Sequence, residues 1–209
     1  MSCGAGIGWR DNVPLLSWLL LRGRCRSCTA AISWRYPAVE VATAALVAAC
    51  VWKYGVSLEA LVAGAFCTAL IAVSATDLEH RIVPNRIVLP AAVVVLAAQT
   101  VLHPSLEWAA AGFGAAAFLF TVALVYPGGM GMGDVKLALL LGAMLGRTVP
   151  VALMAGMVAA LAPTIVLFAR HGAKARKLAI PFAPFLALGS LLALFAGDAV
   201  LDWYLTFLR

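Results

Sequence analysis

The chain has 209 residues, of which 64% are hydrophobic and 11% charged, and its net charge is +6. The mean hydropathy of +1.01 and the low charged fraction exclude an ordinary soluble domain and indicate an integral membrane protein. The positive charge does not indicate nucleic-acid binding, because no basic stretch is long enough, or interleaved with aromatic residues, to form a binding groove.

The first 37 residues differ from the rest of the chain. They mix Arg, Pro, Gly and Cys with short apolar runs, and none of these runs reaches the roughly 20 residues that cross a bilayer. The run VPLLSWLLL is not a signal peptide, because charges flank it on both sides and no small-residue cleavage site follows. The sequence therefore predicts a small cytoplasmic segment over residues 1–37 and a transmembrane domain over residues 38–209.

After Pro37 the chain is apolar and is broken only by short polar loops, which predicts an all-α, polytopic bundle of transmembrane helices. Seven spans are predicted, over residues 38–54, 57–76, 87–102, 106–126, 135–146, 149–169 and 180–197. The fifth span is short for a complete crossing, so we expect it to be tilted, to thin the bilayer locally, or to be partly buried in protein.

Basic residues predict how the bundle is oriented. If the N-terminal segment lies in the cytoplasm, all Lys and Arg residues except Lys53, Arg147 and Arg209 fall on the cytoplasmic side. This asymmetry agrees with the positive-inside rule. It also places the basic stretch RHGAKARK, residues 170–177, at the cytoplasmic membrane surface.

Two aspartates stand at the ends of predicted spans. Asp77 ends the second span, in SATDLEHRIVPN, and Asp134 begins the fifth, in GGMGMGDVK. Two spans lie between them, so the chain returns to the same face and both aspartates are expected at the cytoplasmic boundary of the membrane. The glycines before Asp134, including Gly131 and Gly133, permit close backbone approach, and we expect an extended substrate to lie against them.

The aspartate pair has two interpretations. Two carboxylates in one low-dielectric site cannot both ionise easily, so they share a proton, and one acts as general base toward water while the other acts as general acid. This is the chemistry of an aspartic protease, which needs neither a metal nor a nucleophilic side chain. Alternatively, the aspartates cap helices or pair with Arg81, Arg86 or Lys136.

SATDLEHRIVPN and GMGMGDVKLALLLGAMLG resemble the two catalytic segments of type IV prepilin leader peptidases, a family of GxGD-type intramembrane aspartic proteases. WRDNVPLLSWLLLRGRCRSCTAAISWRYPAVE resembles the cytoplasmic loop of that family, and AIPFAPFLALG resembles a segment nearer its C-terminus, where the family usually has Gly in place of Ala183. The resemblance implies that Asp77 and Asp134 are catalytic and that Gly131 and Gly133 are the glycines of the GxGD motif.

The resemblance also implies a function in the bacterial inner membrane. Such enzymes remove the basic leader peptide from type IV prepilins and from pilin-like type II secretion subunits at the cytoplasmic face, and proteolysis needs no cofactor. Many members then methylate the new N-terminal amine with S-adenosylmethionine. Two other functions stay open from the residues alone: a non-catalytic zinc-binding assembly factor, and an ion-coupled transporter, which would place charges near the middle of the membrane.

Three cysteines lie in the N-terminal segment. By the resemblance, two CxxC pairs hold a structural zinc ion; Cys25 and Cys28 match the second pair, and Cys3 matches the second cysteine of the first pair. The partner of Cys3 would precede Met1, and one family helix is missing, so the sequence is expected to be truncated at its N-terminus and its zinc site to be incomplete. Alternatively, the cysteines are free thiols in a reducing cytoplasm.

Overall fold

The computed structural model describes residues 3–4, 6, 8–13, 15–126, 130–172 and 180–207. In this part of the chain, the N-terminal segment holds a short 3-10 helix, η1 (Trp9–Asn12), the short helix α1 (Leu16–Leu20), and an isolated bridge between Arg24 and Ala31. Seven longer helices follow: α2 (Arg35–Tyr54), α3 (Leu58–His80), α4 (Asn85–Leu102), α5 (Glu107–Val125), α6 (Met132–Leu145), α7 (Val149–His171) and α8 (Ala183–Phe207). The 3-10 turn η2 (Gly146–Thr148) links α6 to α7.

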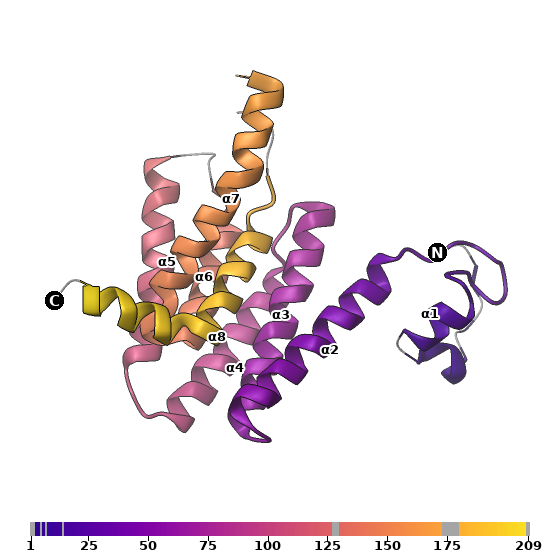
Figure 1. The fold of residues 1–209 in the computed structure, drawn as a ribbon, viewed down its shortest axis with the longest axis horizontal. Coiled ribbons are helices and arrows are strands. Elements are labelled where there is room, and N and C mark those ends of the chain that lie inside the picture. Colours follow the sequence, from indigo (N-terminus) through magenta and orange to yellow (C-terminus); the bar gives the residue numbers. More distant parts are fainter. Residues whose placement is uncertain are drawn as a thin grey trace.

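The seven longer helices match the seven predicted spans, so the all-α polytopic bundle is confirmed. By length and hydropathy they give six candidate membrane spans, because α6, η2 and α7 form one apolar run over residues Met132–Arg170. Figure 1 shows α3 to α8 gathered into a bundle, with α2 slanting away from it and the N-terminal segment beyond the start of α2.

Two helices, α3 and α8, end at least four residues later than predicted. α3 continues past residue 76 to His80, and it ends where Arg81 takes a left-handed conformation with φ 55° and donates its N–H to the carbonyl of Asp77. α8 continues to Phe207 instead of ending near residue 197, because no proline follows Pro184 and the stretch stays mostly apolar. Residues 173–177 of the predicted basic stretch lie outside the described residues.

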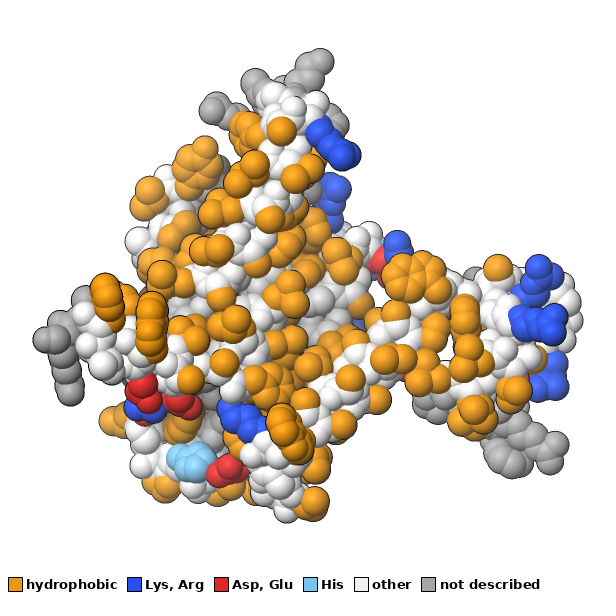
Figure 2. Space-filling model, viewed as in Figure 1, with side chains coloured by type: hydrophobic (Ala, Val, Ile, Leu, Met, Phe, Trp, Pro, Cys, Tyr) orange, Lys and Arg blue, Asp and Glu red, His pale blue; other side chains and the backbone are white. Residues whose placement is uncertain are grey.

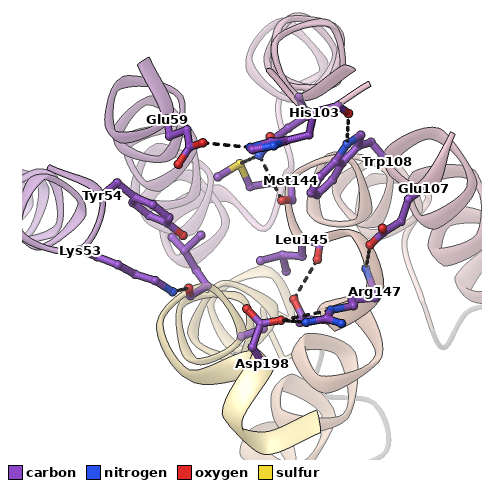
Figure 3. Close-up of a pocket in the computed structure, with 14 residues that line it drawn as sticks. Lys53, Tyr54, Glu59, His103, Glu107, Trp108, Met144, Leu145, Arg147 and Asp198 are labelled. Atoms are coloured by element: carbon purple, nitrogen blue, oxygen red, sulfur yellow. Dashed lines mark hydrogen bonds and ion pairs between the residues drawn. The ribbon is translucent and has the colours of Figure 1, made fainter. Parts of the chain in front are cut away.

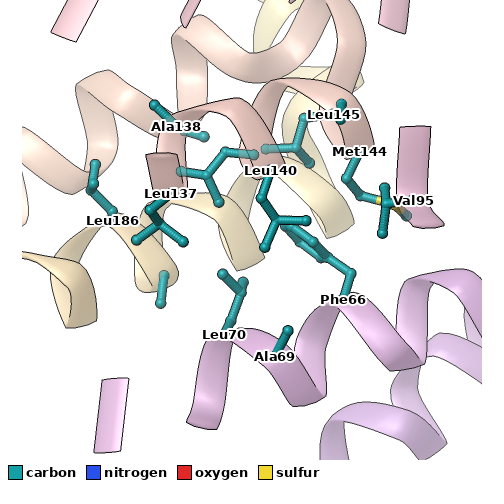
Figure 4. Close-up of a cluster of buried hydrophobic side chains, with 14 of the residues drawn as sticks. Phe66, Ala69, Leu70, Val95, Leu137, Ala138, Leu140, Met144, Leu145 and Leu186 are labelled. Carbon is teal, nitrogen blue, oxygen red and sulfur yellow. The ribbon is translucent and has the colours of Figure 1, made fainter. Parts of the chain in front are cut away.

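α6 is the central helix of the bundle. From Asp134 to Leu145 every residue is buried except Lys136 and Leu139, which are half-buried. Its leucines point toward Phe66 and Leu70 of α3 in the main hydrophobic core (Figure 4). Of the three alternatives for the short fifth span, burial in protein is the one that the structure shows, and α4, α5 and α8 cover its other sides.

Glycines let two helix pairs approach closely. A Cβ atom at Gly142 of α6 would collide with the carbonyl of Ala111 in α5, and a Cβ atom at Gly189 of α8 would collide with the carbonyl of Ala152 in α7. Small residues at such contacts allow close van der Waals packing, which drives helix association where lipid removes the hydrophobic effect. These contacts hold α5 to α6 and α7 to α8.

The bundle has two polar ends. The end of α3 and the starts of α4, α6 and α8 lie together at one end, which is the upper one in Figure 1. The turns from α2 to α3, from α4 to α5 and from α6 to α7 lie at the opposite end. At that opposite end, Lys53 of α2 donates a hydrogen bond to the carbonyl of Leu194 in α8.

Candidate active site

Asp77 is buried in the last turn of α3, with 6% of its surface exposed. Its Oδ2 accepts a hydrogen bond of 3.1 Å from the backbone N–H of Ala183, the first residue of α8. The first N–H groups of a helix have no partner within the helix, so a carboxylate is well suited to accept from one of them. Asp77 thus connects the end of α3 to the beginning of α8.

Asp134 is the third residue of α6 and is 8% exposed. Gly131 is the N-cap of this helix, and its carbonyl accepts the N–H of Asp134 at 3.1 Å. A carboxylate in the first turn also interacts favourably with the helix dipole. The local sequence therefore fixes the Asp134 side chain at the start of a buried helix.

The two carboxyl groups lie at the same end of the bundle, as counting the spans predicts. The segments next to them are in contact, because Gly133 lies against Val83 in the link that follows α3. Within the described residues, neither forms an ion pair with a basic side chain. Lys136, which the alternative interpretation offered as a partner, donates instead to Oδ1 of Asn85 at 3.0 Å.

The glycines of the GxGD motif have different surroundings. A Cβ atom at Gly133 would lie 2.7 Å from the Cβ atom of Val83, whereas one at Gly131 would meet only ordinary contacts, the nearest being Oδ2 of Asp134 at 3.7 Å. The close approach at Gly133 is therefore made by Val83, in the extended link between α3 and α4. This contact holds the segment after Asp77 against the segment that carries Asp134.

The three N-terminal cysteines come together, as predicted. The Sγ atoms of Cys3, Cys25 and Cys28 all lie within 4.8 Å of one another, and those of Cys3 and Cys25 are 3.9 Å apart. Sulfur ligands on a tetrahedral zinc ion, each about 2.3 Å from the metal, would be separated by about 3.8 Å. The sulfur positions therefore fit zinc.

Backbone groups shape this cluster. Thr29 has φ 55° and donates its N–H to the carbonyl of Cys25, which closes a tight turn between the two cysteines of the CxxC pair. Hydrogen bonds from the backbone of Cys28 and Ser27 lower the pKa of the Cys25 thiol to about 7. A thiol that ionises near neutral pH is a good metal ligand, because the thiolate is the form that binds.

A cleft of about 670 Å³ lies beside the cysteines, between the N-terminal segment and the first turns of α2. The aromatic side chains of Trp18 and Tyr36 and the carboxylates of Asp11 and Glu40 contribute to its lining. From the sequence alone, Glu40 could be either a helix-start residue or part of a site. In the structure it accepts the N–H of Leu15 at 2.8 Å, so it holds the N-terminal segment against α2.

A second polar pocket, of about 300 Å³, lies at the end of the bundle opposite the aspartates (Figure 3). Its charged groups are paired within the chain. Glu59 lies 3.0 Å from His103, and Arg147 lies 2.8 Å from Asp198. The backbone N–H of Arg147 also donates to Glu107 at 2.7 Å. These contacts join the ends of neighbouring helices. We therefore interpret the residues around this pocket as structural contacts that hold this end of the bundle together.

Three contacts at the candidate site were not predicted from the sequence. They involve the backbone N–H of Ala183, the side chain of Val83, and the hydrogen bond from Leu15 to Glu40. Ala183 lies within AIPFAPFLALG, a segment that resembles part of the family. This resemblance was the only sequence feature that indicated a role for Ala183. The other two contacts join segments whose spacing in the sequence says nothing about their proximity.

Comparison with known proteins gives two family matches. Residues 1–54 match the bacterial peptidase A24 N-terminal domain, and residues 64–165 match the type IV leader peptidase family. No solved structure matches the chain.

Similar proteins include three that carry the name prepilin leader peptidase/N-methyltransferase. That of Bacillus subtilis is 38% identical, over 93% of this chain and 79% of its own length. Those of Xanthomonas campestris and Pseudomonas aeruginosa are 35% and 36% identical, each over 98% of this chain and over 74% and 73% of their own lengths.

Proposed function

This chain belongs to the type IV leader peptidase family, and from that membership we propose that it is an aspartic endopeptidase. Its substrates are the precursors of type IV pilins or of pilin-like type II secretion subunits, from which it removes the basic leader. The observation that carries the proposal is the pair of buried carboxylates, Asp77 and Asp134, at one end of an apolar bundle. An ion-coupled transporter is less well supported, because both aspartates lie at helix ends instead of midway along a span.

Proteolysis by this pair follows from their shared proton. The ionised carboxylate takes a proton from water as the water oxygen attacks the peptide carbonyl, and the other carboxyl group gives its proton to the carbonyl oxygen. The leaving amine then takes up a proton as the peptide bond breaks. Because Oδ2 of Asp77 accepts the N–H of Ala183, Oδ1 is the oxygen of Asp77 that remains for water or substrate.

Conservative substitutions test this mechanism. Cleavage of a prepilin precursor in detergent is expected to fall by at least 100-fold in Asp77→Asn and in Asp134→Asn, because positioned acid–base groups contribute about 10² to 10⁴ in rate. Asp198→Asn, at the opposite end of the bundle, is the matched control and should cut at the unchanged rate. Equal cleavage by all variants would contradict the mechanism and would favour the non-catalytic assembly factor.

The site is proposed to face the cytoplasm of a bacterial inner membrane, with the chain divided into an N-terminal segment, residues 1–37, and a peptidase domain, residues 38–209. Among the described basic residues, Lys53 and Arg147 lie at the end opposite the aspartates. The others lie at the aspartate end or in the N-terminal segment. The positive-inside rule supports this orientation.

A structural zinc ion is proposed for the cysteine cluster, with Cys3, Cys25 and Cys28 as its ligands. The separation of their sulfur atoms supports zinc, and thiolates are its usual ligands in structural sites. Such an ion would cross-link the N-terminal segment, which has little apolar core of its own. It would take no part in proteolysis.

Methylation of the new N-terminus is proposed as a second activity, with S-adenosylmethionine supplying the methyl group. The cleft beside the cysteines fits this molecule in size and chemistry. The rings of Trp18 and Tyr36 can stack against adenine, and the carboxylate of Glu40 can accept a hydrogen bond from a ribose hydroxyl or attract the positive sulfur.

Equilibrium dialysis with labelled S-adenosylmethionine tests the cleft. Tyr36→Ala is expected to weaken binding about tenfold, because stacking of a base on an aromatic ring contributes about 1–3 kcal/mol. Tyr204→Ala, an exposed tyrosine near the end of α8, is the control and should bind as the unmodified chain does. Unchanged binding by Tyr36→Ala would place the molecule elsewhere.

A further inference from the structure

Helix α1 turns its apolar side outward. Leu16, Leu19 and Leu20 are 57%, 64% and 74% exposed, and their spacing puts them on one face of the helix. Ser17, a polar residue, is buried on the other side. This is the reverse of the pattern of a helix that faces water, so an apolar partner is expected to cover the leucines.

α1 is held close to the start of α2. The N–H of Leu15 donates to Glu40, which lies about 7 Å along the helix axis from Arg35, the first residue of α2. α2 is a candidate membrane span, and Trp34 and Tyr36 at its start are 69% and 68% exposed. Exposed aromatic residues at the end of a span are typical of the membrane–water interface. α1 is therefore attached near the end of a candidate span that carries such aromatic residues.

Basic side chains adjoin the apolar face. Arg22 and Arg24 follow α1 directly and are exposed. Within the described residues they form no ion pair, whereas the neighbouring Arg26 is paired with Asp11 at 2.7 Å. Figure 2 shows blue Lys and Arg side chains at the tip of the N-terminal segment, with orange hydrophobic side chains next to them. An apolar face beside unpaired arginines matches an anionic lipid surface.

We propose that α1 docks on the bilayer that α2 crosses. Leu16, Leu19 and Leu20 insert at the interface, and Arg22 and Arg24 bind anionic phospholipid headgroups. Docking in this way holds the cysteine cluster and the adjoining cleft at the membrane surface. The proposal requires that α2 spans the membrane, but it does not depend on the proposed peptidase activity.

Hydrogen exchange of the full chain in nanodiscs tests the docking. Amides in residues 15–24 are expected to exchange several-fold more slowly with phosphatidylglycerol present than with phosphatidylcholine alone.

Each Arg at an anionic surface strengthens docking roughly fivefold, so Arg22→Gln/Arg24→Gln should remove this difference. Arg86→Gln, an exposed arginine at the start of α4, removes a charge from the same end of the bundle and should leave the difference unchanged. Equal exchange in the two lipids would overturn the proposal.

A photocrosslinking residue in place of Leu20 identifies what covers the face. Docking predicts a crosslink to phospholipid, and a crosslink to a second copy of the chain instead would overturn the proposal. Leu16→Gln/Leu19→Gln should abolish both the lipid crosslink and the slow exchange. Unchanged exchange of peptides from α3 and α6 would verify that the bundle of each variant remains folded.

Discussion

The carboxyl group of Asp77 has a structural contact as well as a proposed chemical role. Its Oδ2 accepts the N–H of Ala183, and Asn at this position would keep an oxygen that can accept the same bond. Ala would leave a buried N–H without a partner, at a cost of about 1–3 kcal/mol. Loss of activity in an Asp77→Ala variant could therefore come from the missing acid–base group or from a less stable fold. The Asp77→Asn variant separates these two effects, because it keeps the structural hydrogen bond.

The residues of the site were only partly predictable from sequence. Counting the spans was enough to predict that Asp77 and Asp134 lie at the same face of the membrane, because each apolar run crosses the membrane once. The same count says nothing about which side chain occupies the space beside Gly133, because that depends on the path of the link between α3 and α4. The position of Val83 beside Gly133 was therefore not predicted.

The contact between Gly133 and Val83 leads to a prediction on stability. Gly133→Ala would bring a methyl group to 2.7 Å from the Cβ atom of Val83, so unfolding in detergent should become easier by about 1–3 kcal/mol. Gly131→Ala, whose Cβ atom has room, should cost less. Combining Gly133→Ala with Val83→Gly, which removes that Cβ atom, should cost less than the sum of the two single changes. Additive effects would show that the two residues do not interact.

At the scale of helices, the sequence predicted the number, order and approximate bounds of the spans, because long apolar runs are the main requirement for crossing a bilayer. Hydropathy does not distinguish a helix that faces lipid from one that faces protein. The sequence consequently left three explanations for the short fifth span, and packing around α6 decides among them. The close contacts at Gly142 and Gly189 also depend on packing, which the apolar pattern does not encode.

The glycine contact between α5 and α6 should be far more sensitive than an ordinary helical glycine. Gly142→Ala would collide with the backbone of Ala111, which cannot move aside alone, so we expect a loss of at least about 2 kcal/mol in unfolding free energy. Gly114→Ala in α5 has open space and should be neutral or stabilising by about 0.5–1 kcal/mol. Thermal unfolding of both variants in one detergent makes the comparison, and similar melting temperatures would contradict the proposed packing.

At the scale of the whole molecule, the N-terminal segment and the bundle depend on different interactions. The bundle is held by the packing of α3 to α8 around α6. The segment is held by the turn at the cysteines and by the hydrogen bond of Leu15 to Glu40, and by the ion pair of Arg26 with Asp11. Composition alone predicted a boundary near Pro37, because the density of charged residues falls there.

This division predicts that metal affects one part only. Purified protein should contain about one zinc ion per chain, and Cys25→Ser or Cys28→Ser should lose it. Cys50→Ser, a buried cysteine of α2, should retain the metal. Removing zinc with a chelator should speed hydrogen exchange in residues 15–33 without changing exchange in α3 or α6. Absence of zinc from the unmodified chain would contradict the proposed ligand set.

The length of α6 has a consequence for how the protein is made. A helix of 14 residues is about 21 Å long, short of the roughly 30 Å of hydrocarbon in a bilayer, and almost none of its surface is free for lipid. During synthesis α6 therefore reaches a stable environment only after α4 and α5 have been inserted. The N–H group that Asp77 binds belongs to α8, which is synthesised after α3 to α7. Nascent chains that stop before α8 lack this bond, so peptidase activity should arise only after α8 has been synthesised.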